Sequence, residues 1–422
     1  MLYKISYTIS YNGIYQIKHW KKIFIQELLV FDNKGLAVYY YFMKSKVSIV
    51  RCFEYKEEKV DRALKEAITL IGGLEGLIKR GDKVLIKVNL LQAIPPQAAI
   101  TTHPFIVKSI IILLKELGAI PLIGDSPGGA FLNIERTWQV TGMTDIARGM
   151  GVKLVNFEAD PPVKVDNPQG KFFKSFYIAR PVVEADKIIS VPKCKTHSLM
   201  LFSGALKNLL GVVPGLLKIE FHKRCPKPQD LAETIVELFS VIRPHLSIMD
   251  AVVALEGDGP GTGGRPKQVG CILAGQDSVA LDAVATRLIN IEPFKILTTK
   301  IAANKNLGKG TLEEIDILGE DSNNFIVENF MLPKGSVANK LPVLLVTWLT
   351  SLISVRATID RSKCSMCELC FKSCPVNAII KVDNWFVIDN NQCIKCLCCH
   401  EFCPNKAIKL KRSILHRRFV RN

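Results

Sequence analysis

Two runs of cysteine near the C-terminal end of the chain have the spacing of metal-cluster ligands. The first run, Cys-x2-Cys-x2-Cys-x3-Cys-Pro, extends from Cys364 to Pro375, and the second repeats it from Cys393 to Pro404. Cysteine thiolates bind iron and zinc. Three thiolates on one short loop can contact three irons of a cubane cluster, while a cysteine from elsewhere contacts the fourth. The spacing therefore predicts iron-sulfur chemistry.

The two runs belong to a duplicated unit. Each residue of the second run lies 29 positions after its counterpart, and the same offset relates Ile359-Asp360 to Ile388-Asp389. Residues 356–410 resemble a two-cluster bacterial ferredoxin domain, in which the fourth cysteine of each run serves the other cluster. The resemblance implies two [4Fe-4S] clusters, one bound by Cys364, Cys367, Cys370 and Cys403 and the other by Cys393, Cys396, Cys399 and Cys374.

Two alternatives concern these cysteines. Four-cysteine zinc sites also use Cys-x2-Cys pairs, but the triplets and the trailing prolines favour clusters. Cys398 has no counterpart in the first run, where Leu369 occupies the matching place. We interpret Cys398 as a packing thiol, with substitution for a ligand as the alternative. Residues 1–30 lack a small-residue cleavage site, so we expect a cytoplasmic protein, in which reduced cysteines bind metal.

Upstream of the cysteines, short apolar segments alternate with amphipathic helical ones. A helix is predicted over Glu57–Ile71, and another begins at Pro104, where His103 is placed to cap it. The predicted strands include Lys83–Val88, Ile120–Gly124, Val152–Phe157, Lys187–Val191, Leu246–Met249 and Val269–Leu273. Strands separated by helices need crossover connections. The sequence thus predicts an α/β fold with a mostly parallel sheet flanked by helices, followed by a small α+β two-[4Fe-4S] ferredoxin-like domain.

Polar side chains follow several of these strands, where open α/β sheets usually bind ligands. They are Lys87, Asn89, Asp125–Gly129, Pro192–His197, Asp250, Glu256, Asp258, the glycines up to Gly264, Lys207-Asn208, Asp277 and Asp282. Together they predict an anion or metal pocket. The candidate catalytic residues are Lys193, Lys195, His197 and Asp125, because two lysines can hold a phosphate or carboxylate while an imidazole exchanges protons. A surface turn with solvated lysines is the alternative.

Two further patterns in this region carry less weight. Gly259-x-Gly261-x-x-Gly264 matches a dinucleotide fingerprint in letters, but it leads into a strand instead of opening a helix, which favours a flexible loop or lid. A mononuclear metal site from Cys194, His197, His222 and Cys225 is the other alternative, although its spacing matches no zinc pattern.

Residues from Val47 to Glu320 resemble the domain of unknown function 362 family. The segments that carry the resemblance are Gly81–Asn89, Gly124–Gly129, Lys193–His197, Gly204–Gly211 and Met249–Val252. Members of that family often carry a C-terminal ferredoxin domain, as this chain does. The resemblance implies no settled reaction.

The chain is expected to divide into five parts. Residues 1–42 hold seven of the nine tyrosines and are interpreted as an atypical extension, with Met43 as the native start. The α/β domain spans 43–325, a linker with an apolar helix 326–355, the ferredoxin-type domain 356–410 and a basic tail 411–422. The apolar stretch Leu341–Val355 is shorter than the ~20 residues needed to span a bilayer, so we expect no transmembrane span and leave peripheral membrane contact open.

Three functions are compatible with these features. The first is a redox protein, an oxidoreductase in electron transport, whose ferredoxin domain relays electrons to or from a small-molecule substrate or a redox partner protein at the α/β domain. The second is a non-catalytic electron carrier whose α/β domain docks client enzymes. The third, nucleic-acid binding through the basic tail of a chain with net charge +17, is disfavoured. The sequence does not determine the oligomeric state.

Overall fold

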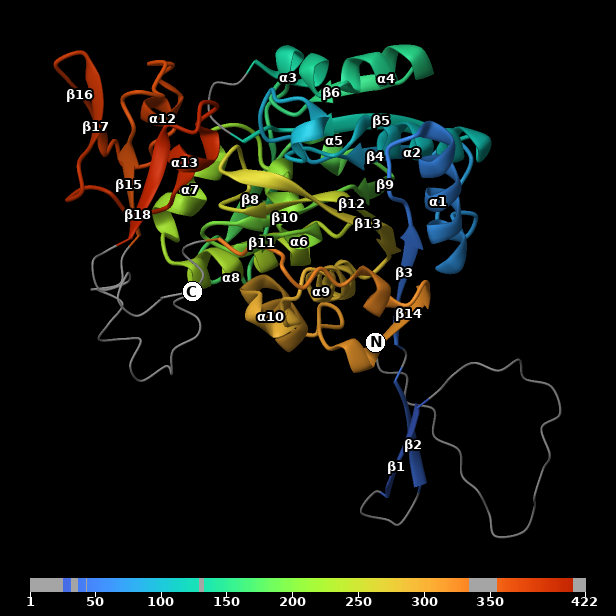
Figure 1. Cartoon of the computed structure of the whole chain (residues 1–422). Coiled ribbons are helices and arrows are strands. Elements are labelled where there is room, and N and C mark those ends of the chain that lie inside the picture. The colour runs from blue at the N-terminus through green and yellow to red at the C-terminus, as the bar shows by residue number, and fades with distance from the viewer. Residues whose placement is uncertain (1–25, 32–36, 43, 129–132, 334–354, 413–422) are drawn as a thin grey trace, which may run out of the picture.

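A ten-stranded sheet is the largest element of the computed structural model, which describes residues 26–31, 37–42, 44–128, 133–333 and 355–412 (Figure 1). The strand order is β14-β3-β13-β12-β9-β4-β5-β6, with β10 paired to β12 and β11 to β10. The strands are β3 (Ser45–Arg51), β4 (Lys83–Lys87), β5 (Ile120–Asp125), β6 (Lys153–Asn156), β9 (Lys187–Ser190), β10 (Lys193–His197), β11 (Leu201–Ser203), β12 (Leu246–Gly257), β13 (Gly264–Gly275) and β14 (Ile315–Gly319).

The sheet is mostly parallel, as predicted. All neighbours from β12 to β6 run parallel, and so do β14 and β3. Strand β13 is antiparallel to both of its neighbours, β12 and β3, because a short turn rather than a helix joins β12 to β13.

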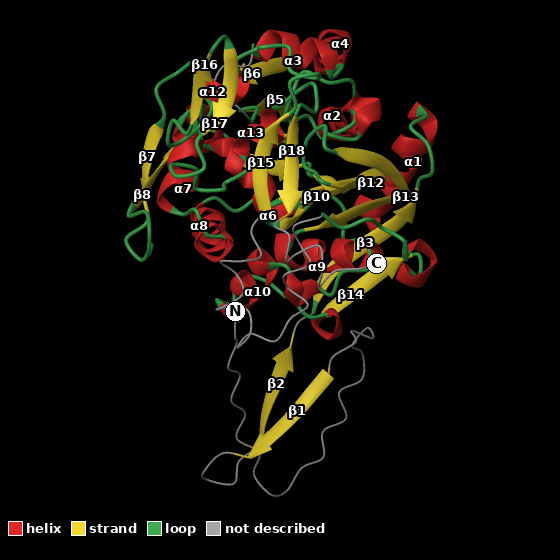
Figure 2. Ribbon diagram, turned by 60° about the vertical axis from the view of Figure 1, so that its left-hand side comes forward, coloured by secondary structure: helices red, strands yellow, loops and turns green. Residues whose placement is uncertain are grey.

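Helices cover both faces of the sheet (Figures 1 and 2). They are α1 (Glu57–Leu70), α2 (Pro104–Glu116), α3 (Ile134–Val140), α4 (Met143–Met150), α5 (Arg180–Val183), α6 (Ala205–Asn208), α7 (Leu217–Arg224), α8 (Pro228–Val241), α9 (Ser278–Leu288) and α10 (Leu297–Asn304). Within β4, Val84 and Ile86 pack in one core with α1 and α2, whereas Leu85 packs in a second core with α8. A strand buried on both faces is apolar throughout, which explains the short apolar runs in the sequence.

Residues 355–412 form a smaller unit beside α7, drawn in orange and red in Figure 1. Strand β15 (Val355–Ile359) pairs antiparallel with β18 (Ile408–Arg412), and β16 (Ile379–Val382) pairs with β17 (Trp385–Ile388). Two short helices, α12 (Leu369–Lys372) and α13 (Cys398–Phe402), follow the two cysteine loops. Two further hairpins lie outside the main sheet: β1 (Gln26–Phe31) with β2 (Ala37–Phe42), and β7 (Val163–Asp166) with β8 (Ser175–Ile178).

Two local expectations can be compared with the structure. His103 caps α2, since its side chain accepts a hydrogen bond from the backbone amide of Phe105 at 3.2 Å. The segment from Lys193 to His197 is a fully buried strand, so the surface-turn alternative is wrong. None of the described helices is long and apolar enough to cross a membrane. The apolar segment 341–354 and the tail beyond Arg412 lie outside the described residues.

Candidate functional site

The small C-terminal unit contains two hollows, each lined by four cysteines. Cys364, Cys367, Cys370 and Cys403 line one, of about 340 Å³. Cys374, Cys393, Cys396 and Cys399 line the other, of about 370 Å³. All eight are free thiols. The structure thus brings together the two sets that the ferredoxin resemblance implies, including the exchange of the fourth cysteine between the runs.

The loops around the hollows have a backbone conformation that the duplication repeats. Met366 and Glu368 in the first loop, and Lys395 and Leu397 in the second, have φ between 55° and 63°. Such left-handed residues other than glycine persist only where the surrounding structure requires them. The two exchanged cysteines also match, because the Sγ atoms of Cys374 and Cys403 each accept a backbone amide at 3.2 Å, from Ala378 and Ala407 respectively.

A larger cavity of about 780 Å³ lies where the α/β domain meets α13. Its polar lining from the α/β domain consists of Lys87, Asn89, Asp125, Ser126, Lys195, Ser203, Lys207, Asn208, Lys218 and His222. The ferredoxin-type unit contributes Cys398, Glu401 and Phe402. Strands β4 and β5 end at this cavity, so it lies at the carboxyl edge of the parallel sheet, where α/β folds bind ligands.

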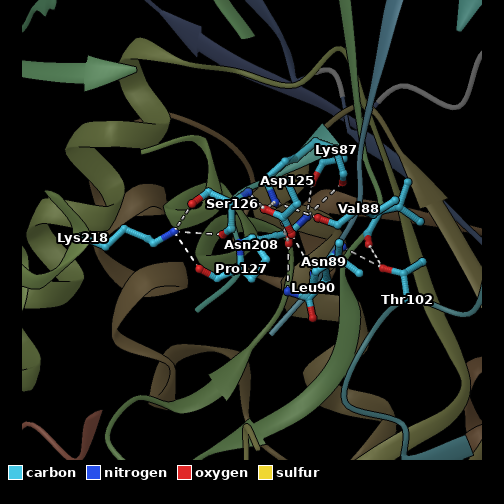
Figure 3. A network of polar contacts seen from close by, with 12 residues as sticks. Lys87, Val88, Asn89, Leu90, Thr102, Asp125, Ser126, Pro127, Asn208 and Lys218 are labelled. Atoms are coloured by element: carbon cyan, nitrogen blue, oxygen red, sulfur yellow. Dashed lines mark hydrogen bonds and ion pairs between the residues drawn. The ribbon is translucent and has the colours of Figure 1, made fainter. Parts of the chain in front are cut away.

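A buried ion pair forms the floor of the pocket (Figure 3). Lys87 Nζ lies 2.7 Å from Asp125 Oδ1, and the two side chains are 1% and 2% exposed. Burial lowers the pKa of Lys87 and raises that of Asp125, and their mutual attraction offsets part of both shifts. The other Asp125 oxygen accepts the Leu90 amide at 2.7 Å. Gly211 passes directly over this pair, where a Cβ atom would collide with both charged groups.

Two asparagines connect this floor to a second lysine. Lys195 Nζ donates to Asn89 Oδ1 at 2.6 Å and to the Ile100 carbonyl at 2.9 Å. Asn89 Nδ2 donates to Asn208 Oδ1 at 3.0 Å. Burial, followed by repulsion from Lys207, lowers the pKa of Lys195 to about 7. The ammonium of Lys195 therefore has neutral partners only, and it titrates close to neutral pH.

Helix α6 presents Lys207 and Asn208 to the pocket, and a buried carboxylate fixes the start of this helix. Asp282 in α9 accepts the backbone amides of Ala205 at 2.6 Å and Leu206 at 3.0 Å. Burial raises the pKa of Asp282 to about 7, although the two amide hydrogen bonds counteract it. Asp282 is therefore a positioning residue beneath the pocket rather than part of its lining.

Helix α7 adds two pocket residues, Lys218 and His222, one helical turn apart. Sequence reasoning missed Lys218 and considered His222 only as a ligand of the alternative metal site. Lys218 Nζ donates to the carbonyl oxygens of Ser126 at 2.9 Å and Pro127 at 3.0 Å (Figure 3). Burial lowers its pKa to about 8. His222 Nδ1 is buried and has no hydrogen-bond partner among the described residues. The i, i+4 spacing of the two residues was the available signal.

The four candidate catalytic residues separate into two pairs. Asp125 and Lys195 line the pocket, whereas Lys193 and His197 do not. Lys193 Nζ is 2.9 Å from Asp250 Oδ2 and donates to the Tyr55 hydroxyl at 2.6 Å, so its charge is neutralised in the core. A regular strand would place Lys193 and Lys195, two residues apart, on the same face. The two lysines have different surroundings, and the pairing of β10 with β12 shifts register between them.

His197 connects the two domains. Its Nδ1 accepts the backbone amides of Leu199 at 3.1 Å and Met200 at 3.2 Å, so the neutral ring carries its proton on Nε2. Nε2 lies 3.1 Å from Glu401 Oε1, although the two groups are not aligned as a hydrogen bond. Burial lowers the pKa of His197 to about 4, and the ring is uncharged at neutral pH.

The glycine-rich turn between β12 and β13 packs against α13. A Cβ atom on Gly261 would lie 2.5 Å from the Glu401 carbonyl oxygen, so this approach requires glycine. The next residue, Thr262, donates to the Cys403 carbonyl at 2.7 Å, and Gln92 Nε2 donates to the Glu401 carbonyl at 2.8 Å. The turn leads into β13 and not into a helix, so its glycines serve the contact between domains and not a dinucleotide fingerprint.

The alternative mononuclear metal site is not assembled. Cys194 and Cys225 belong to different hydrophobic cores, and Cys225 Sγ lies 3.2 Å from Thr234 Oγ1. In the described part of the chain, no three His, Cys, Asp or Glu side chains are placed to hold a single metal ion.

An α/β sheet domain joined to a ferredoxin-type domain defines the class of this protein. Residues 84–287 match the sequence profile of the family described as "Domain of unknown function (DUF362)". Residues 357–380 match the profile of the "4Fe-4S binding domain", which supports an iron-sulfur electron-carrier role.

One curated relative and one solved structure can be compared with the chain. The "Thylakoid-associated protein sll1697" of Synechocystis sp. is 31% identical over 294 residues, which cover 69% of this chain and 89% of the relative. The chain therefore belongs to the DUF362 family. The solved lactate racemase apoprotein from Thermoanaerobacterium thermosaccharolyticum is similar with a TM-score of 0.37 and 14% identity, over 60% of this chain and 59% of that one. A likeness this distant supports no argument about function.

Proposed function

We propose that this protein is an iron-sulfur electron-transfer protein whose ferredoxin domain holds two [4Fe-4S] clusters and exchanges single electrons with a small molecule in the pocket. One observation supports the relay above all others. Within α13, Cys399 lines the second cysteine hollow, while its neighbour Cys398 and Glu401 line the pocket. A single helical turn therefore separates the second cluster site from the ligand site.

The hollows fit such clusters in number and chemistry of ligands. Each offers four thiols, and the exchanged cysteine of each also accepts a backbone amide, a contact that stabilises thiolate charge. When bound, the clusters would supply single-electron chemistry. The chain itself contributes the thiolates, the amide donors and the left-handed loop residues that shape each hollow.

The two hollows differ in exposure, so the proposed relay would lead from an exposed first hollow to a second hollow beside the pocket. Cys367 of the first hollow is exposed, and the neighbouring Phe371 is 41% exposed. Cys396 of the second hollow is buried, and this hollow abuts the helix that closes the pocket. A redox partner protein would approach the first hollow, while the small molecule occupies the opposite side of the second.

The pocket residues can bind, orient and exchange a proton with a bound molecule. Lys195, with a pKa of about 7, can hold or release a proton at neutral pH, and Asn89 fixes its position. Phe402 and Glu401 cover the pocket from the ferredoxin side and limit the access of water. The ion pair of Lys87 and Asp125 holds the floor rigid.

Adjacent cysteines of α13 provide a matched test of the cluster sites. We expect anaerobically purified protein to contain about eight irons and eight sulfides per chain. Cys399→Ser should lose about half of both, together with one of two cluster signals in EPR spectroscopy. Cys398→Ser, one position away and assigned to the pocket wall, should keep full iron. Equal iron loss in both variants would contradict the ligand assignment.

A second experiment separates the relay from the alternative of a carrier that only docks clients. Small molecules released from the anaerobic protein are identified by mass spectrometry, and their rate of reoxidation of the dithionite-reduced protein is measured. Lys195→Gln should abolish this reaction while electron exchange with methyl viologen continues unchanged. A wild-type rate in the variant would favour the carrier alternative.

A further inference from the structure

We propose that the pocket binds its small molecule through an oxyanion group, a carboxylate or a phosphate, held by Lys207 and Lys195. This inference rests on the proposed function, because it specifies the chemical class of the molecule held at the same site. It depends on the balance of charge in the pocket, on donors without partners and on the shape of the apolar wall.

The charge of the lining favours an anion. Four lysines and two carboxylates line the pocket. Asp125 neutralises Lys87 at 2.7 Å, and Lys218 is held by carbonyl and hydroxyl oxygens. Glu401 is the one other carboxylate of this lining, and it faces the two remaining lysines, Lys195 and Lys207. Burying excess positive charge is costly unless an anion or hydrogen bonds compensate it. An anionic ligand would supply that compensation.

Two groups of the lining are also free to donate to a ligand. The Lys207 side chain makes no hydrogen bond or ion pair with any described residue, although burial lowers the pKa of its ammonium and Glu401 counteracts this. His222 Nδ1 is buried without a partner, and burial lowers the pKa of the ring, which is therefore neutral and can carry its proton on Nδ1. A carboxylate or phosphate has enough acceptor oxygens for Lys207, Lys195 and His222 together.

The remaining lining indicates that the oxyanion is attached to an organic body. Apolar side chains form the other walls of the 780 Å³ cavity: Leu90, Leu91, Leu210, Ile219, Pro260 and Phe402. Pockets with apolar walls and a few convergent polar groups are typical of sites for small organic molecules. Phe402 comes from the ferredoxin side, so the organic body would lie nearest α13.

The test is direct binding to the anaerobic holoprotein, measured by isothermal titration calorimetry with three probes. Benzoate supplies a carboxylate on an apolar body, benzamide is its neutral isostere, and inorganic phosphate supplies the oxyanion alone. We expect benzoate to bind and benzamide to bind at least tenfold more weakly. Lys207→Gln should weaken benzoate binding by roughly ten- to a hundredfold, as expected for a lost charge-assisted hydrogen bond. Lys223→Gln, exposed on α7, is the matched control and should bind normally.

A measurement on the unchanged protein covers the case in which Lys207→Gln does not fold. Acetylation of lysines with an activated ester, followed by peptide mass spectrometry, should show that benzoate protects Lys207 and not Lys223. Phosphate binding that Lys207→Gln weakens would also support the oxyanion site and assign the group to a phosphoryl ligand. Equal binding of benzoate and benzamide, or no protection of Lys207, would overturn the inference. The iron content of Cys399→Ser and the reoxidation assay would still judge electron transfer separately.

Discussion

Gly261→Ala should loosen the docking of the ferredoxin domain on the α/β domain without unfolding either. The added Cβ would lie 2.5 Å from the Glu401 carbonyl oxygen, a distance that real Cβ atoms essentially never show. The backbone fixes the position of a Cβ atom, and the carbonyl is itself a backbone group, so neither can rotate away. The turn and α13 must therefore separate by several tenths of an ångström or more.

The expected magnitude comes from the hydrogen bonds at this contact. Separation breaks the bond from Gln92 to the Glu401 carbonyl, at 2.8 Å, and the bond from Thr262 to the Cys403 carbonyl, at 2.7 Å. Each contributes about 1 kcal/mol, so the loss is about 2 kcal/mol, or roughly thirtyfold in the equilibrium for local opening. His400 Nε2 also lies 3.2 Å from the Asp258 carbonyl, and its Nδ1 lies 2.8 Å from the Ile408 carbonyl. A neutral imidazole has one N–H for these two carbonyls, so the contact with Asp258 adds nothing to the loss of about 2 kcal/mol.

Hydrogen exchange measured by mass spectrometry under anaerobic conditions gives the readout. Amides of residues 398–403 should exchange roughly thirtyfold faster in the variant, because local opening limits their exchange. Amides in the α1 core should be unaffected. Gly76→Ala is the control, since a Cβ at Gly76 meets nothing within 4 Å. Unchanged exchange over residues 398–403 in a folded Gly261→Ala protein would refute the role assigned to this turn.

Three further substitutions test other parts of the site, each by urea unfolding of the anaerobic protein. Gly211→Ala should destabilise by about 3 kcal/mol, because its Cβ collides with the buried pair of Lys87 and Asp125; a loss under 1 kcal/mol would contradict this. The pKa of His197 is about 4 in the folded protein and 6.5 when unfolded, which stabilises the fold by about 3 kcal/mol above pH 6.5. This stability is lost as the pH falls through 4, and His197→Asn should lack this dependence of the unfolding free energy on pH. The raised pKa of Asp282, about 7, changes stability with pH in the opposite direction. About 4 kcal/mol of stability is present below pH 4 and is lost as the pH rises through 7. The unfolding free energy of Asp282→Asn should vary less over that range.

The alternation of apolar strands and amphipathic helices was sufficient to predict the mostly parallel sheet and the position of most of its central strands. It failed at β10, which was predicted as part of a polar loop. A strand reading Lys-Cys-Lys-Thr-His has no apolar alternation, and its buried lysines are satisfied by Asp250 and Asn89, which lie far away in the sequence. Such partners cannot be recognised from local pattern. Strand β12 is longer than predicted for a related reason, since its end pairs Glu256 with Arg265 across the turn to β13.

The candidate site was predictable wherever the chemistry is local. Cysteine spacing was enough to group the thiols, and polar residues at strand ends located Lys87, Asn89 and Asp125 at one edge. What the sequence could not supply is the closure of that edge by α13. Glu401 and Cys398 belong to the ferredoxin repeat, and nothing in the repeat indicates which of its faces contacts the α/β domain. The glycine turn matches a nucleotide motif in letters only, and its Gly261 permits the close backbone contact with Glu401.

The buried lysines of the α/β domain fall into two groups, those paired with a carboxylate and those that face the pocket without one. Lys87 and Lys193 each lie within 3 Å of a carboxylate, and removing either partner would leave an uncompensated buried charge. Lys195 and Lys207 have no carboxylate at ion-pair distance among the described residues, yet they face a cavity instead of the core. Lys195 has hydrogen bonds to neutral oxygens only, which offset the desolvation of an ammonium less than a carboxylate does, and Lys207 has no such bond. Uncompensated charge beside a helix that also supplies a cluster cysteine is best explained by a ligand that brings the missing negative charge.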